Sequence, residues 1–383
     1  MSSKNLKETT KMPTISLCMI VKNEDEYLLQ CLNSVKELVD EIVIIDTGSK
    51  DKTKEIAEEF KKEFPSLKIL NFGWVNDFSS ARNFSISYAS CDWILFMDAD
   101  ECIDKNTAEK IKKLIVNNKS DGFMLVQRNY TDNSQIVGWQ QNDESYLKKE
   151  KFTGYYPVHI TRLFKNNKGF VFRRKVHENV DESIFEKKGK IKVTELPIHH
   201  FQYERGEEFV KQKQLEYFKI CENILKERAD FKAHFDMGII LLSHKKEFEK
   251  ASEHFKKSIK LNPNYLLSYL KLGLAYEKLN MPESALEIYK RALSIEKNNL
   301  NLVHNIGVLF SKLNKPDLAL KYLDMALRLN PRVPQTYTNI GCVFGQLQKY
   351  KEATTFFKKA LELNPTDSST QKYLEMTIAK IKK

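Results

Sequence analysis

Apolar and polar positions follow two different patterns in the first half of the chain. Strand-like runs rich in apolar residues occupy residues 15–21, 41–46, 68–72, 93–97 and 122–127. Between them, apolar side chains recur at helical spacing in residues 24–38, 51–64 and 104–116, and Asn23 is the expected N-cap of the first of these helices. Strands that alternate with helices predict an α/β, Rossmann-like domain with a mainly parallel sheet covered on both faces.

The second half of the chain repeats with a period of 34 residues. Four alanines recur at that interval, and four glycines recur at 35, 34 and 34 residues: Ala251, Ala285, Ala319 and Ala353, with Gly238, Gly273, Gly307 and Gly341. Small residues let two helices approach closely, and a bulky residue such as Phe255 fills the remaining gap. The pattern resembles an all-α tetratricopeptide-repeat solenoid. Its four units would begin near residues 231, 266, 300 and 334, before a polar capping helix over 368–383.

The 383 residues are enough for two domains. We expect a polar N-terminal tail over 1–13, the α/β domain over 14–205, a linking helix over 206–230 and the repeats over 231–383. Residues 1–13 lack the apolar core of a secretory signal, and the longest apolar run is too short to cross a bilayer. Six scattered cysteines indicate reduced thiols. These features predict a cytoplasmic protein without a transmembrane segment.

A formal net charge of +11 would suit an acidic partner. However, lysines are spread along the whole chain and interleaved with glutamates, and no basic run is combined with stacking aromatic residues. This pattern is typical of solvated helix faces, so we expect no nucleic-acid partner.

Acidic residues follow the predicted strands. The segment WILFMDADE (93–101) ends in Asp98, Asp100 and Glu101, and Asp46 ends the second strand. Ligands of parallel sheets bind beyond the carboxyl ends of the strands, and buried carboxylates are costly unless a cation is present. Their hard oxygen atoms suit Mg²⁺ or Mn²⁺ held jointly with a diphosphate leaving group. The alternative is a solvated turn, because many surface loops carry D-x-D.

Four segments in sequence carry a more specific resemblance: SLCMIVKNEDEYLLQCLNSV, DEIVIIDTGSKDKT, DFSSARNFSISYASCDWILFMDADE and KVHE. Over residues 14–205 they resemble family-2 inverting glycosyltransferases of the GT-A fold. The resemblance implies that Asp46 accepts from the base of a uridine nucleotide, that Asp98 lies near the ribose and that Asp100 binds the metal. The other donor-binding residues that it implies are Val21, Asn23, Glu24, Arg82, Asn83 and Ala99. An exposed helix residue is the alternative for Arg82.

An inverting transfer needs a base that accepts a proton from the acceptor. Glu178 is the best match to the acidic residue that relatives place after the D-x-D, with His177 beside it toward the acceptor. The Glu-Asp pair and the Q-x-x-R-W box of many relatives are absent. Glu101 and Asp181 are therefore alternatives for the base.

Further candidates surround the donor. His200 matches a histidine that closes the domain in similar enzymes, so it is a candidate for the metal shell or a diphosphate contact, with a structural role equally open. Arg162 and the basic cluster at 173–175 are candidates for the diphosphate, and a solvated basic turn explains the cluster equally well.

The leading hypothesis is a UDP-sugar-dependent hexosyltransferase. An interaction protein without activity is the alternative of another class, and a sugar nucleotidylyltransferase would need a glycine-rich loop that VKNEDEY lacks. Repeat arrays hold extended peptides, which favours a peptide or protein acceptor. Asn305 and Asn339 occupy equivalent repeat positions, either to bind that peptide or because asparagine is common there.

The arrangement of a GT-A domain followed by repeats resembles the sublancin-type S-glycosyltransferases, which glycosylate a cysteine of a bacteriocin precursor. A cell-surface glycan or a lipid-linked acceptor is the alternative. Repeat arrays often pair through an apolar end, so a homodimer stays open.

Overall fold

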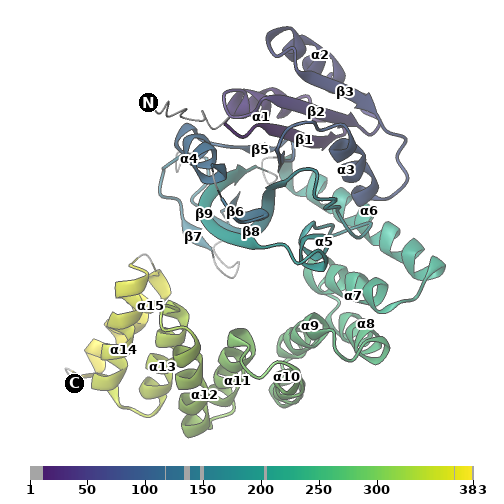
Figure 1. The fold of residues 1–383 in the computed structure, drawn as a ribbon. Helices are drawn as coiled ribbons and strands as arrows, with labels where there is room; N and C mark the ends of the chain where they lie inside the picture. The colour runs from purple at the N-terminus through teal and green to yellow at the C-terminus, as the bar shows by residue number, and fades with distance from the viewer. Residues whose placement is uncertain are drawn as a thin grey trace, which may run out of the picture. The chain divides into compact units, whose positions relative to one another are not determined.

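A computed structural model describes residues 12–116, 118–132, 139–146, 151–201, 205–365 and 367–381. The chain divides into two compact units, Met1–Gln212 and Lys213–Lys383 (Figure 1). The boundary falls inside helix α6 (Gly206–Glu227), which begins where the linking helix was predicted. Most of the predicted N-terminal tail lies outside the described residues.

The described part of unit 1 contains one nine-stranded mixed sheet in the order β3-β2-β1-β4-β8-β6-β9-β5, with β7 paired to β8. Its strands are β1 (Ile15–Val21), β2 (Glu41–Asp46), β3 (Leu67–Asn71), β4 (Trp93–Phe96), β5 (Glu101–Cys102), β6 (Gly122–Tyr130), β7 (Gln140–Gln141), β8 (Gly154–Lys165) and β9 (Ile191–His200). Neighbouring strands are parallel from β3 through β4, whereas β8 runs antiparallel to both β4 and β6.

The predicted α/β Rossmann-like fold is confirmed, and the predicted strands 15–21 and 41–46 have the observed limits. Strands β8 and β9 were not predicted. Polar side chains interrupt both, and β9 contains Pro197, so neither has the continuous apolar run of a buried parallel strand. The sheet is therefore parallel over its first four strands and mixed beyond them.

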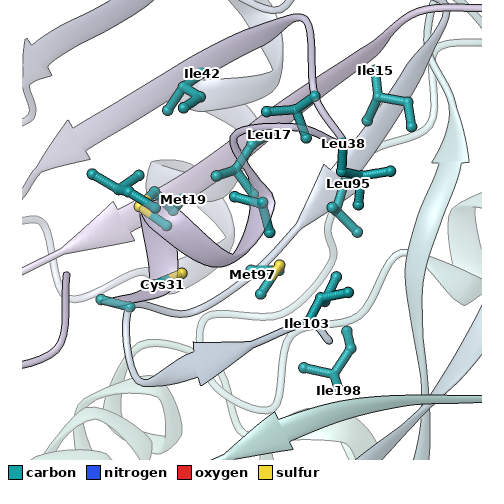
Figure 2. Packing of buried hydrophobic residues seen from close by; sticks show 14 of the residues in the cluster. Ile15, Leu17, Met19, Cys31, Leu38, Ile42, Leu95, Met97, Ile103 and Ile198 are labelled. Carbon is teal, nitrogen blue, oxygen red and sulfur yellow. The ribbon is translucent and has the colours of Figure 1, made fainter. Parts of the chain in front are cut away.

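Helices cover both faces of the sheet: α1 (Leu28–Val35), α2 (Thr53–Glu63), α3 (Phe78–Ser87), α4 (Lys105–Ile115) and α5 (Asp181–Glu186). On one face, alternate residues of β1 and β4 share one buried cluster with residues of α1 and α4. Figure 2 shows Leu17, Met19 and Leu95 in this cluster. On the other face, Cys18 and Phe96 pack toward α3 and α5. Burial on both faces explains the continuous apolar strands.

Unit 2 is a helical array: α7 (Phe231–Ile240), α8 (Phe248–Leu261), α9 (Leu266–Lys278), α10 (Pro282–Ile295), α11 (Leu300–Lys312), α12 (Pro316–Leu329), α13 (Pro334–Gln346), α14 (Tyr350–Leu363) and α15 (Ser368–Ile381). The first helix of each pair begins at residue 231, 266, 300 or 334, as the period predicts. The four repeat alanines are fully buried.

Glycine is required where the paired helices meet. A Cβ atom on Gly273 would lie 2.1 Å from the ring of Tyr289, and one on Gly341 would lie 2.6 Å from the ring of Phe357. These are the bulky residues that the sequence places four positions after the repeat alanine.

The first repeat contains one extra residue between Gly238 and Ala251. A π-helix, η2 (Leu241–Lys245), follows α7 at this place, and Lys246 ends it with a φ of 54°. A π-turn accommodates one residue more than the α-helical turn it replaces. Gly238 therefore still faces Phe255, whose ring lies 2.6 Å from a Cβ atom placed on the glycine.

We predict that Gly273→Ala destabilises unit 2 by about 1–3 kcal/mol, because the added methyl group overlaps the buried ring of Tyr289. Gly345→Ala in α13 is the matched control, because nothing lies within 4 Å of its Cβ position. We expect the control to stabilise the protein by about 0.5–1 kcal/mol through helix propensity. Urea unfolding followed by circular dichroism measures both, and equal effects would contradict the prediction.

Candidate functional site

The loops after β1 and β2 are joined by hydrogen bonds. The carbonyl of Val21 accepts from the N–H of Thr47 at 3.0 Å, and the Asn23 side chain accepts from the N–H of Lys50 at 2.8 Å. Asn23 has a φ of 57°, and α1 begins only after Tyr27. The expectation that Asn23 caps this helix is therefore wrong, because its side chain connects the two loops instead.

Asp46 ends β2 as a buried carboxylate. It accepts from the N–H groups of Gly48 at 3.1 Å and Ser49 at 3.2 Å, and it pairs with Lys54 at 3.0 Å. Burial alone would raise the pKa of Asp46, but the hydrogen bonds from Ser49, Lys54 and Gly48 outweigh it and lower the pKa. The group is thus an anionic acceptor at the edge of the sheet.

Arg82 lies between two acidic residues rather than on an exposed helix face. Its Nε donates to Glu178 at 2.7 Å, its Nη2 donates to Asp98 at 3.2 Å, and its guanidinium lies 4.0 Å from the ring centroid of Phe96. The side chain is 10% exposed. Arg82 and Glu178 are 96 positions apart in the sequence. They meet because α3 packs against the segment that leads to Glu178.

A second buried arginine, Arg162, binds two carboxylates of the D-x-D segment. Arg162 on β8 donates through one nitrogen to Glu101 at 2.6 Å and to Asp98 at 3.2 Å. Glu101 is fully buried and accepts from the Asp98 N–H at 2.8 Å and from the Gln127 side chain. Burial raises the pKa of Glu101, and the charge of Arg162 opposes this shift.

These contacts argue against two of the sequence-based alternatives. Glu101 has no exposed surface from which to take a proton from an acceptor. Arg162 is bound to two carboxylates, so its guanidinium orients the D-x-D segment rather than facing a diphosphate. Both side chains support the position of Asp98.

Asp100 faces His200, which ends β9. Asp100 Oδ1 lies 3.5 Å from His200 Nε2, and both side chains are less than 10% exposed. His200 Nδ1 lies 2.6 Å from the Asn129 oxygen, whose amide nitrogen donates to backbone carbonyls. In the neutral ring, Nδ1 therefore carries the hydrogen, and the Nε2 lone pair points toward the Asp100 carboxylate. Two electron-pair donors facing each other suit a cation between them.

Asp100 also has a basic neighbour that the sequence analysis missed. Arg205, directly before α6, lies 3.5 Å from Asp100 Oδ2 and donates to the Glu24 carboxylate. Gln127 and Asn129 were missed as well. Polar residues at alternate positions of the otherwise buried β6 are a signal that could have found these two, whereas no pattern marks Arg205.

The other predicted site residues of unit 1 make different contacts or have different positions. The Asn83 amide donates to the carbonyl of Phe172 at 3.0 Å and accepts from its N–H at 2.7 Å, so it holds the chain that leads to Glu178. Ala99 is buried between the two aspartates of the motif. His177 adopts a φ of 51° directly before Glu178. Asp181 begins α5, and burial raises its pKa.

The basic cluster at 173–175 is partly neutralised. Arg173 pairs with Glu186 at 3.0 Å, and Arg174 pairs with Glu182, both on α5. These pairs favour a structural role for the two arginines.

The two asparagines predicted to bind a peptide have neighbours within the repeat array. The Asn339 amide nitrogen lies 3.1 Å from Nε2 of His304. Asn305 lies near the hydroxyl group of Tyr289. These neighbours give both asparagines a place in the packing of unit 2, so binding of a peptide is not needed to explain them.

The two units of the chain match different protein families. The family described as "Glycosyl transferase family 2" matches residues 16–181. Tetratricopeptide-repeat families match residues 241–280, 266–299, 300–333 and 334–367. The chain joins a family-2 glycosyltransferase domain to tetratricopeptide repeats. The expected family-2 glycosyltransferase domain and the expected repeats are confirmed.

Curated relatives that match half of this chain or more include the following two. The SPbeta prophage-derived glycosyltransferase SunS of Bacillus subtilis is 32% identical over 66% of this chain and 54% of its own length. A tetratricopeptide repeat-containing protein of Synechococcus elongatus is 35% identical over 51% of this chain and 43% of its own. The chain thus spans about half the length of these relatives. Among solved structures, that of MamA is 21% identical with a TM-score of 0.37, covering 39% of this chain and 81% of its own.

No helix within the described residues combines the length and the apolar character that a bilayer crossing needs.

The lowered pKa of Asp46 predicts how this residue affects stability at different pH values. A carboxylate whose pKa is lower in the folded protein stabilises it above the ordinary aspartate pKa of about 3.9. That contribution is lost as the pH falls through the lower, folded-state value. We expect wild type to be more stable than Asp46→Asn at pH 7, with the difference narrowing below about pH 4. Urea unfolding of both proteins across this pH range measures the difference in their free energies of unfolding. A difference that does not change with pH would contradict the prediction.

Proposed function

We propose that this protein transfers a sugar with inversion from a UDP-sugar to a side chain of a peptide or protein. The observation that carries the proposal is the set of carboxylates at the ends of β2 and β4, of which Asp46 and Asp100 are buried, in a domain that matches family-2 glycosyltransferases. Asp46 ends β2, and Asp98 and Asp100 follow β4, so all three lie at the carboxyl ends of parallel strands, where α/β sheets bind their ligands.

The nucleotide would bind against the loops after β1 and β2. The Asp46 carboxylate is an anionic acceptor for a uracil N–H group, and it is oriented by Gly48 and Ser49. Asp98, held between Arg82 and Arg162, keeps 32% of its side chain exposed and is available to the ribose. The fixed orientation of both carboxylates lowers the entropy cost of binding.

Asp100 and His200 would hold the divalent ion. Within the described residues, no group of three or more histidine, cysteine or acidic side chains is arranged as a complete metal site. Two protein ligands suffice where the diphosphate and water supply the others. A mixed set of carboxylate and imidazole suits Mn²⁺ better than Mg²⁺. When bound, the ion would neutralise charge on the departing diphosphate.

Glu178 is our proposed base. The Nε of Arg82 donates to its Oε1 atom and so orients the carboxylate beside Asp98 at the edge of the donor site. Asp181 is the alternative, although it begins a helix and burial raises its pKa. A cysteine acceptor would need less help from a base, because a thiol pKa of about 8.5 lies far below that of a hydroxyl group.

A peptide acceptor is supported by the repeats, since such arrays present extended binding surfaces. The similarity to the glycosyltransferase SunS supports the transfer of a sugar. The peptide acceptor itself is inferred from the repeats and from the resemblance of the domain arrangement to sublancin-type S-glycosyltransferases. We therefore propose a cysteine-containing peptide as the first acceptor to test, with a serine-containing peptide of the same sequence as the comparison.

The metal assignment predicts that UDP-sugar hydrolysis requires Mn²⁺ and stops with EDTA. Asp100→Ala should lower the rate at least about 100-fold, because the ion loses a protein ligand. Asp324→Ala is the control, because Asp324 lies on the exposed side of α12 and pairs with Arg328 of the same helix. Hydrolysis measured by UDP release, across several UDP-sugars, tests this. Equal rates with EDTA would remove the ion from the mechanism.

Glu178→Gln should lower the rate of transfer to the peptide by about 10²–10⁴-fold, since the amide cannot accept the proton. The amide oxygen can still accept from Arg82, so UDP binding should remain close to that of wild type. Transfer is followed by mass spectrometry of the peptide, and UDP binding by calorimetry. A transfer rate like that of wild type would exclude Glu178 and leave Asp181.

A further inference from the structure

A buried arginine lies between two carboxylates at the edge of the donor site. The Arg205 side chain is 6% exposed, and its Nη1 donates to Glu24 at 3.2 Å. Its Nη2 donates to the same carboxylate and lies 3.5 Å from Asp100 Oδ2. The guanidinium also lies 4.5 Å from the ring centroid of Tyr27. Contacts with three residues fix the orientation of this cation.

Asp100 therefore has a different neighbour at each oxygen. Oδ1 faces His200, whereas Oδ2 faces Arg205. A divalent ion between Asp100 and His200 would be attracted by the carboxylate and repelled by the nearby guanidinium. The repulsion is weakly screened, because Asp100 and Arg205 are both buried.

Arg205 differs from the other two arginines of the site. Arg82 and Arg162 are bound to Asp98, which the proposed metal ligands do not include. Arg205 instead lies beside Asp100, which is one of those ligands. Its main partner, Glu24, belongs to the loop after β1, which the nucleotide is proposed to contact.

We propose that Arg205 is a positioning residue that holds Asp100 in the free protein and competes there with the divalent ion. The ion then binds weakly to the free protein and tightly only when a nucleoside diphosphate adds its negative charge. This inference rests on the proposed metal site and assigns a role to a residue outside the D-x-D motif.

Mn²⁺ binding, measured by electron paramagnetic resonance with and without UDP, tests the inference without relying on turnover. The variants are Arg205→Gln, which removes the charge, and Arg205→Lys, which keeps it. Arg173→Gln is the matched control, because it removes an arginine that pairs with Glu186 at the surface. Asp100→Ala tests the metal site itself.

We expect Arg205→Gln to bind Mn²⁺ about tenfold more tightly than wild type in the absence of UDP, the effect of one nearby charge on a carboxylate. UDP should then strengthen Mn²⁺ binding by a smaller factor than in wild type. Arg205→Lys and Arg173→Gln should remain within about twofold of wild type.

Unchanged or weaker Mn²⁺ binding by Arg205→Gln, alongside normal binding by Arg205→Lys, would overturn the inference and leave the proposed metal site intact. Mn²⁺ binding that Asp100→Ala does not affect, or no binding by wild type with UDP, would overturn the metal site and the inference together. The two failures are therefore distinguishable.

Discussion

Acidic side chains at the end of β4 lie within the protein interior, where each charge needs a partner. Glu101 is fully buried, and Asp100 is 5% exposed. Three arginines from different parts of the chain provide the opposite charge: Arg82 from α3, Arg162 from β8 and Arg205 from the segment before α6. Without Arg162, the fully buried Glu101 would lose its charged partner, which would strongly destabilise the domain. The pairing therefore constrains both the fold and the geometry of the donor site.

The mixed half of the sheet contributes polar and charged side chains that contact the buried carboxylates. Strand β8 carries Arg162, β6 carries Gln127 and Asn129, and β9 ends at His200. Each contacts the segment after β4 or a residue that does. The end of β2 and the segment after β4 thus provide the carboxylates, and β6, β8 and β9 fix their orientation.

Much of the fold could be predicted because it depends on periodicity. Strands β1 and β4 are long apolar runs, and the repeat helices begin where the 34-residue period places them. The same reasoning failed for β8 and β9, where polar side chains such as Arg162 and His200 face a buried charge network rather than solvent. Asp46, Asp98 and Asp100 could be found from their positions after strands. The partners of these residues could not, because a contact such as Arg82 with Glu178 joins residues that no local pattern connects.

The π-helix in the first repeat shows how a helical array tolerates a change in length. An added residue in an ordinary α-helix rotates all that follows by about 100°, which would turn an apolar face away from its neighbour. Here the wider turn at Leu241–Lys245 absorbs the addition before α8 begins. The later repeats keep their phase, so the array can gain or lose a residue at this junction without repacking the helices beyond it.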